Sequence, residues 1–247
     1  MRRNILITGA SSGLGEEMAR QFAAKGHNLA LTARREDRLK ALRTELIAAH
    51  PGLTILVRTL DVNDHDAVFA TFRAIDADLS LDRIVVNAGI GKGAPLGTGR
   101  FDANLITAQT NFTAVLAQAE AALELFRSKN AGHLVFISSV AAMRGLPKSV
   151  TTYAATKAAI ATLAEGLQLE LLGKPIKVST IFPGYIRSEL NDHVARAPMI
   201  VDTVPGVRAM VAAIESEKAK AFAPPWPWVV MARFLKYAPL PLLKRMV

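Results

Sequence analysis

The feature that most constrains the fold is a glycine-rich turn that directly follows an apolar run near the start of the chain. Residues 5–7 predict a buried strand, residues 8–15 read T-G-A-S-S-G-L-G, and a helix is expected from about Glu16. A helix that starts in such a turn points unpaired backbone N–H groups at one spot, which favours an anion. Glycine at positions 9, 13 and 15 lets the backbone bend sharply and approach a pyrophosphate. The G-x-x-x-G-x-G spacing therefore predicts a dinucleotide site, and the alternative is a glycine turn without a ligand.

Strand-like and helical segments alternate after this turn. We expect strands at 4–8, 28–33, 54–60, 83–87, 133–137 and 176–182, and helical segments at 16–25, 36–49, 64–77, a long alanine-rich region ending near 127, and 152–172. Parallel strands need crossover connections, which place helices on both faces of the sheet. The pattern predicts an α/β fold with a Rossmann-type, doubly wound parallel sheet of about seven strands. Its ligand is expected at the carboxyl ends of the strands.

Length and composition limit the remaining possibilities. The 247 residues favour one domain over residues 1–247. The chain has no cysteine, which excludes disulfides and thiolate metal sites, and the first strand begins at Asn4, so we expect a cytoplasmic protein without a signal peptide. The five histidines stand apart, so no metal site is expected. The formal charge of +9 suits an anionic partner, but no motif accompanies it that would indicate nucleic acid.

Two residues that can move a proton lie one helical turn apart. Tyr153 and Lys157 fall near the start of the helix expected at 152–172, so their side chains share one face. A phenol normally has a pKa of about 10, and an ammonium about 4 Å away would lower it by up to about three units. Such a phenol could transfer protons near neutral pH. The alternative is a half-buried tyrosine beside a surface lysine.

These segments carry a series of motifs that together resemble the short-chain dehydrogenase/reductase family over about residues 4–187. The motifs occur in the family's order: Thr8-Gly9-x-x-x-Gly13-x-Gly15, Asp61-Val62, Asn87-Ala88-Gly89, Asn111, Ser139, Tyr153-x-x-x-Lys157 and Pro183-Gly184. The resemblance implies an oxidoreductase that moves a hydride between a nicotinamide and a carbonyl/alcohol pair. It also implies a homodimer or homotetramer that pairs through the helical regions 111–127 and 152–172.

The resemblance assigns roles to the candidate catalytic residues. Tyr153 would be the general acid in reduction and the base in oxidation. Lys157 would lower the pKa of that phenol and hold the nicotinamide ribose. Ser139 would polarise the reacting oxygen, and Asn111 would hold a water that relays protons to Lys157.

The resemblance also implies a set of cofactor contacts. Asp61 and Val62 would lie near the adenine, Asn87 would support the sheet beneath the cofactor, and Pro183, Gly184 and Ile186 would border the nicotinamide. The remaining candidate contacts lie in the two glycine-containing loops: Gly9, Ser11, Ser12, Gly13, Leu14, Gly15, Ala88 and Gly89.

Three positions depart from the family pattern. Val86 replaces the first of two asparagines, and Ser188 stands where a threonine is common. Ser139 precedes Tyr153 by 14 residues where 13 is usual, and we expect the extra residue in the loop at 147–152.

The end of the second strand indicates which nicotinamide cofactor is used. An acidic side chain there would bind a ribose 2′-hydroxyl, whereas arginine accommodates a 2′-phosphate. The sequence reads Ala33-Arg34-Arg35, which predicts NADP(H), with Arg34 as the principal phosphate contact and Arg35 or Ser11 as secondary contacts. The alternative is that both arginines are solvated charges at a helix start.

The last third of the chain has no motif. Residues 187–202 correspond in position to a variable substrate lid, in which Leu190, His193, Val194, Met199 and Ile200 suit a moderately apolar pocket. Residues 224–247 form a basic, apolar tail that suits a membrane interface, and the alternatives are a cover over the active site or a subunit interface. A lipophilic ketone or aldehyde is the expected substrate. A catalytically silent NADP(H)-binding sensor or scaffold is the alternative function.

Overall fold

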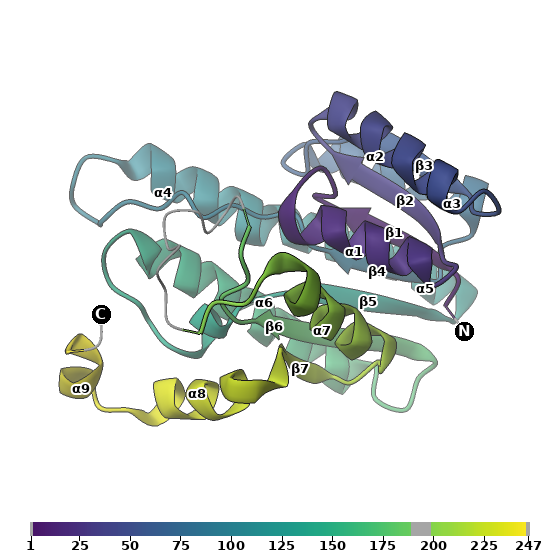
Figure 1. Cartoon of the computed structure of the whole chain (residues 1–247). Helices are drawn as coiled ribbons and strands as arrows, with labels where there is room; N and C mark the ends of the chain where they lie inside the picture. Colours follow the sequence, from purple (N-terminus) through teal and green to yellow (C-terminus); the bar gives the residue numbers. More distant parts are fainter. Residues whose placement is uncertain (1, 189–198, 246–247) are drawn as a thin grey trace.

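The six expected strands all form, and a seventh joins them at one edge. In the computed structural model, which describes residues 2–188 and 199–245, the strands build one parallel sheet in the order β3-β2-β1-β4-β5-β6-β7 (Figure 1). Their bounds are β1 Asn4–Thr8, β2 Asn28–Ala33, β3 Ile55–Thr59, β4 Arg83–Val86, β5 Gly132–Ile137, β6 Ile176–Pro183 and β7 Lys220–Ala223. The strand order reverses between β1 and β4, and in such sheets this switch point is where ligands bind.

Helices cover both faces of the sheet because successive side chains of each strand point to opposite faces. Ile5 and Ile7 pack in one cluster with α1 (Gly13–Ala24), α2 (Glu36–Ala49) and α7 (Thr203–Glu215). Leu6 packs in the other cluster with α3 (His65–Leu79), α5 (Ala114–Lys129) and α6 (Thr151–Glu170). The sheet is therefore buried on both sides, as the continuous apolar strands predict.

The long alanine-rich region is not one regular helix. It consists of α4 (Phe101–Ala108), a π-helical turn (Gln109–Thr113) and α5. Single π turns inside helices frequently occur at functional sites, and this one contains Asn111.

The C-terminal segment forms an arm that leaves the sheet after β7. Its two helices are α8 (Pro225–Tyr237) and α9 (Leu240–Lys244), and the backbone of Trp226 within α8 is non-helical. Figure 1 shows this arm in yellow, running past the end of the sheet at which the strands finish. The helix α8 ends at Tyr237, two residues before Pro239, and α9 follows directly after that proline.

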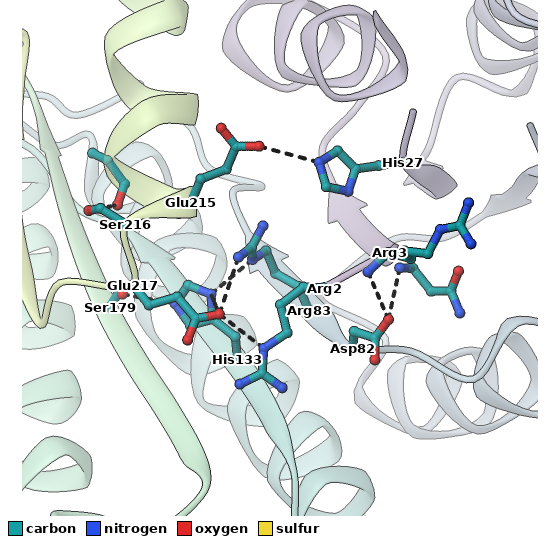
Figure 2. A network of polar contacts seen from close by, with 12 residues as sticks. Arg2, Arg3, His27, Asp82, Arg83, His133, Ser179, Glu215, Ser216 and Glu217 are labelled. Carbon is teal, nitrogen blue, oxygen red and sulfur yellow. Dashed lines mark hydrogen bonds and ion pairs between the residues drawn. The ribbon is translucent and has the colours of Figure 1, made fainter. Parts of the chain in front are cut away.

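A polar network joins β4, β5, β6 and the loop before β7 at the other end of the sheet (Figure 2). The buried Arg83 donates to Nδ1 of His133 at 2.8 Å and pairs with Glu217 at 3.4 Å. Since a guanidinium only donates, His133 Nδ1 is the acceptor and Nε2 carries the proton toward Ser179 Oγ, 2.8 Å away. Arg2 pairs with the same Glu217 at 3.0 Å.

Candidate active site

The turn between β1 and α1 requires its glycines. Gly9 and Gly13 have positive φ angles of 68° and 56°, where side chains are disfavoured. A Cβ on Gly15 would overlap the carbonyl oxygen of Gly9. Ser12 is the N-cap residue of α1, and its side chain makes no capping hydrogen bond. The first-turn N–H groups of α1 therefore have no side-chain cap of their own, as an anion site requires.

Asn87 ties this turn to the loop after β4. Its Nδ2 donates to the carbonyl oxygens of Thr8 at 2.9 Å and Gly9 at 3.3 Å. In return, Thr8 Oγ1 accepts the backbone N–H groups of Asn87 at 3.1 Å and Ala88 at 3.2 Å. These contacts need only one asparagine, so the valine at position 86 does not disrupt them.

The two arginines after β2 differ in their surroundings. Arg35 is half-buried and donates to Ser11 Oγ at 3.2 Å and Ser12 Oγ at 2.6 Å, so its guanidinium lies on the glycine turn. Arg34 is exposed beside it. The buried Ala33 stands where an acidic residue would repel a 2′-phosphate. One arginine is therefore held against the turn, and its neighbour in the chain is exposed.

The other edge of the predicted adenine site follows β3. Asp61 is exposed, and its Oδ1 accepts the backbone N–H and the side-chain Nδ2 of Asn63, both at 3.0 Å. Val62 is buried in the core beneath it. Asp61 thus remains at the surface of this edge while Val62 fixes the loop.

β5 and α6 bring Ser139 and Tyr153 together. Ser139 follows β5, Tyr153 lies in the first turn of α6, and the Ser139 hydroxyl lies close enough to the phenol to affect its pKa. Ser139 Oγ also accepts the N–H of Ala141 at 3.1 Å. The loop between them contains a 3-10 turn at Lys148–Val150, so the unusual 14-residue spacing does not separate the two hydroxyls.

Lys157 lies behind the phenol, on the same face of α6. Its buried ammonium is 5.8 Å from the centroid of the Tyr153 ring and donates to the carbonyl oxygen of Ile137 at 2.9 Å. Ser138 Oγ in turn donates to the carbonyl oxygen of Lys157 at 2.8 Å. These bonds fix the start of α6 against the end of β5.

The protonation of these groups differs from the expectation based on spacing. Burial raises the pKa of Tyr153, against the lowering effect of the Ser139 hydroxyl, and Tyr185 nearby also raises it. The ammonium of Lys157 donates to the carbonyl oxygen of Ile137, and it does not outweigh the effect of burial on the pKa of Tyr153. Burial lowers the pKa of Lys157 to about 8. At neutral pH the phenol is therefore protonated, and so is most of Lys157.

Asn111 holds the loop after β4, at Gly89 and Ile90, close to Lys157. Its Oδ1 accepts the N–H of Ile90 and its Nδ2 donates to the carbonyl oxygen of Ile90, each at 2.8 Å. Nδ2 also lies 3.4 Å from Thr156 Oγ1 on α6. A Cβ on Gly89 would stand 3.2 Å from Asn111 Oδ1 and 3.5 Å from Lys157 Nζ. Gly89 therefore lets the loop approach both residues closely.

The end of β6 completes the site. Gly184 donates to the carbonyl oxygen of Ala223 at 3.0 Å, and the buried Ile186 forms a bridge with Val201. Of the predicted lid, Met199 and Ile200 lie at the described end, while Leu190, His193 and Val194 lie outside the described residues. Ser188 lies beside the glycine turn, because a Cβ added to Gly13 would be 3.4 Å from the Cβ of Ser188.

Three further residues near the site were not predicted from the sequence. The indole of Trp228 on α8 contacts Gly184, and its ring packs edge-on against Tyr185 with centroids 5.3 Å apart. Arg144, in the loop after Ser139, donates to the carbonyl oxygens of Lys236 and Ala238, both at 3.2 Å. Only Tyr185 had a local signal, because it directly follows the Pro-Gly motif.

The fold and the site define a nucleotide-binding α/β protein with a serine, a tyrosine and a lysine at the strand ends. The sequence model of the short chain dehydrogenase family matches residues 3–198. An uncharacterised oxidoreductase of Mycobacterium tuberculosis is 48% identical over 99% of this chain and 97% of its own length. The chain belongs to the short-chain dehydrogenase/reductase family.

Solved structures agree with the fold. A short-chain dehydrogenase from Sphingobium yanoikuyae, in complex with NADPH, is 28% identical with a TM-score of 0.83, covering 98% of this chain and 95% of that one. A family member from Burkholderia phymatum, in complex with NAD, has a TM-score of 0.84 at 21% identity, covering 94% and 92%, and this likeness concerns the fold alone.

Proposed function

We propose that this protein is an NADP(H)-dependent oxidoreductase that reduces a lipophilic ketone or aldehyde to an alcohol. The observation that carries the proposal is the placement of Ser139, Tyr153 and a buried Lys157 together at the strand ends, next to the glycine turn. A protein that only binds a nucleotide has no need of these three side chains in this arrangement. The whole of residues 1–247 would act as one catalytic domain, with 187–202 as its substrate lid.

The residues present fit a phosphorylated dinucleotide. The uncapped start of α1 and the close approach permitted by Gly15 suit a pyrophosphate. Arg34 would be the principal contact of the 2′-phosphate, and Arg35, already on the turn with Ser11, the secondary contact. Binding of NADPH by the Sphingobium relative supports the same assignment.

The chain's own residues would orient the carbonyl group and supply the proton. The nicotinamide, when bound, supplies the hydride to the carbonyl carbon. Ser139 and Tyr153 would both donate hydrogen bonds to the carbonyl oxygen, and Tyr153 would transfer its proton to that oxygen as the alcohol forms. Lys157 would then stabilise the phenolate. Asn111, whose side chain is bonded to the backbone of Ile90, would hold the water that relays a proton to Lys157.

The protonation of Tyr153 favours reduction over oxidation. Reduction needs a phenol that carries its proton, whereas oxidation needs the phenolate as a base. Burial raises the pKa of this phenol and so favours the protonated form. A cytoplasmic location would supply the NADPH.

An apolar helix face supports self-association as a homodimer or homotetramer. A shallow hollow of about 530 Å³ lies over α6 and the π turn. It is lined almost entirely by apolar atoms of Phe112, Ala159, Thr162, Leu163, Gly166 and Leu167. Apolar surface of this kind is typical of an interface between subunits.

The test is consumption of NADPH with aldehydes, steroid-like ketones, acyl-chain ketones and quinones. We expect turnover with at least one class, and a kcat lowered by about 10²–10⁴-fold in Tyr153→Phe with unchanged NADPH affinity. Tyr237→Phe removes an exposed hydroxyl and serves as the matched control. Tight NADPH binding without turnover of any class would instead support the sensor or scaffold function.

A further inference from the structure

The C-terminal arm, α8 and α9, has one face that belongs to the enzyme core. Trp228 and Ala232 are buried on α8, one helical turn apart, and Ala238 and Leu243 are buried further along the arm. Arg144 fixes the end of α8 through two backbone carbonyls. The arm is therefore a packed part of the molecule with a defined outer face.

That outer face is apolar where a solvated helix would be polar. Val230, Phe234 and Tyr237 follow one another at helical spacings of four and three, and the side chain of Trp226 precedes them. Trp226 and Tyr237 are each 76% exposed, and Leu240 on α9 is 67% exposed. Two of these side chains are the amphipathic aromatics that prefer a membrane interface.

The charge on the arm has one sign. Residues 218–247 contain no Asp or Glu and six Lys or Arg. Arg233 and Lys236 flank the apolar stripe on α8, and Lys244 and Arg245 end α9, all of them exposed. A second copy of the arm would bring like charges together, so this surface suits an anionic partner.

The arm also lies close to the catalytic residues. It runs past the end of the sheet at which the strands finish (Figure 1). Its inner face contacts Gly184 and Tyr185 through Trp228, and Arg144 connects it to the loop after Ser139. A partner bound to the outer face of the arm would therefore lie close to the catalytic residues.

We infer that the outer face of α8 and α9 docks the protein on an anionic lipid surface. Within residues 2–188 and 199–245, no helix is long and apolar enough to cross a bilayer. The aromatic and aliphatic side chains enter the interface, and the cations contact lipid phosphates. The inference goes beyond the proposed reaction, since docking requires no turnover, and it gives a lipophilic substrate a direct route to the site.

The experiment is flotation of the full chain with vesicles of phosphatidylcholine alone or mixed with phosphatidylglycerol. We expect binding to the mixed vesicles at about 0.1 M salt and its loss at about 1 M salt. Arg233→Gln combined with Lys236→Gln is expected to weaken binding about fivefold for each cation removed, so about 25-fold for the pair. The matched control, Lys174→Gln with Lys177→Gln, removes two exposed cations at the other end of the sheet and leaves binding unchanged.

A second pair of variants tests the apolar contribution. Phe234→Ser on the arm is expected to weaken vesicle binding about tenfold or more, whereas Leu172→Ser, at an exposed leucine outside the arm, has no effect. NADPH affinity, unchanged in all four proteins, shows that each is folded. Equal flotation of arm and control variants, or no binding to anionic vesicles, overturns the inference. A loss of oligomer mass in the arm variants, without vesicle binding, would show that this face is a subunit interface.

Discussion

The indole of Trp228 lies against Gly184, so that a Cβ at position 184 would overlap the ring. The same ring packs edge-on against Tyr185, and its Nε1 is buried without a hydrogen-bond partner. The arm therefore supports the backbone that is proposed to border the nicotinamide. Packing from the arm is therefore sufficient to explain why position 184 has no side chain.

Removal of this ring should therefore affect both stability and the site. Trp228→Ala is expected to lower the free energy of unfolding by about 3–5 kcal/mol, because it leaves a cavity under Gly184 and Tyr185. Urea unfolding measures this change, and NADPH titration measures the accompanying loss of affinity. Trp226→Ala, two residues away but exposed, is the control and should change stability by less than about 0.5 kcal/mol. Equal effects of the two variants would show that the arm is not packed as described.

Local patterns were sufficient to predict most of the sheet and the helices beside it. The strands at 4–8 and 28–33 and the helix at 36–49 have the predicted bounds. The two strands are nearly continuous apolar runs, and the helix has buried leucines at helical spacing between a charged start and a Pro-Gly end. The strand β7 was not located in advance, because its four residues, K-A-F-A, include no β-branched residue, whereas the equally short β4 reads R-I-V-V.

The site was less predictable wherever it depends on contacts between distant segments. The contact of Trp228 with Gly184, and that of Arg144 with the arm, join parts of the chain with no shared motif. The π turn lies where the Asn111 side chain bonds to the loop at Ile90, and helix propensity carries no information about such a contact. Similarly, spacing alone suggested a lowered pKa for Tyr153, because it could not show how strongly burial raises that pKa.

The two arginines after β2 should contribute unequally to cofactor choice. Arg34→Ala is expected to weaken NADPH binding by about tenfold to a hundredfold with little effect on NADH, because it removes a charge-assisted contact to the 2′-phosphate alone. Arg35→Ala should weaken both cofactors, since Arg35 also holds Ser11 and Ser12 of the turn. Dissociation constants from fluorescence titration distinguish the two patterns. Unchanged selectivity in Arg34→Ala would contradict the assignment of the principal contact.

The buried Lys157 should set an alkaline limit on reduction. Burial lowers its pKa to about 8, so the ammonium that would stabilise the phenolate is lost as the pH rises through 8. The value of kcat/KM for reduction is then expected to fall by up to tenfold per pH unit above about pH 8. Lys157→Arg keeps its charge in this range and should remove the fall, at a lower overall rate. A profile that is flat from pH 7 to about pH 10 in the unsubstituted enzyme would exclude this role.

His133 should make the protein less stable in mild acid. Burial, together with the nearby charges of Arg83 and Arg2, lowers the pKa of His133 to about 2. Between that value and the ordinary pKa of about 6.5, the unfolded chain binds a proton at this residue that the folded chain does not bind. The free energy of unfolding should therefore fall as the pH drops below about 6.5, by up to about 1.4 kcal/mol per unit.

The His133→Gln variant isolates this contribution. Its amide oxygen can accept from Arg83 and its amide nitrogen can donate to Ser179, as the imidazole does, but the amide does not titrate. Urea unfolding between about pH 4 and pH 7 is expected to show a smaller loss of stability in acid for this variant. His65→Gln, at an exposed histidine on α3, should keep the original slope. If both variants keep that slope, groups other than His133 carry the acid sensitivity of the protein.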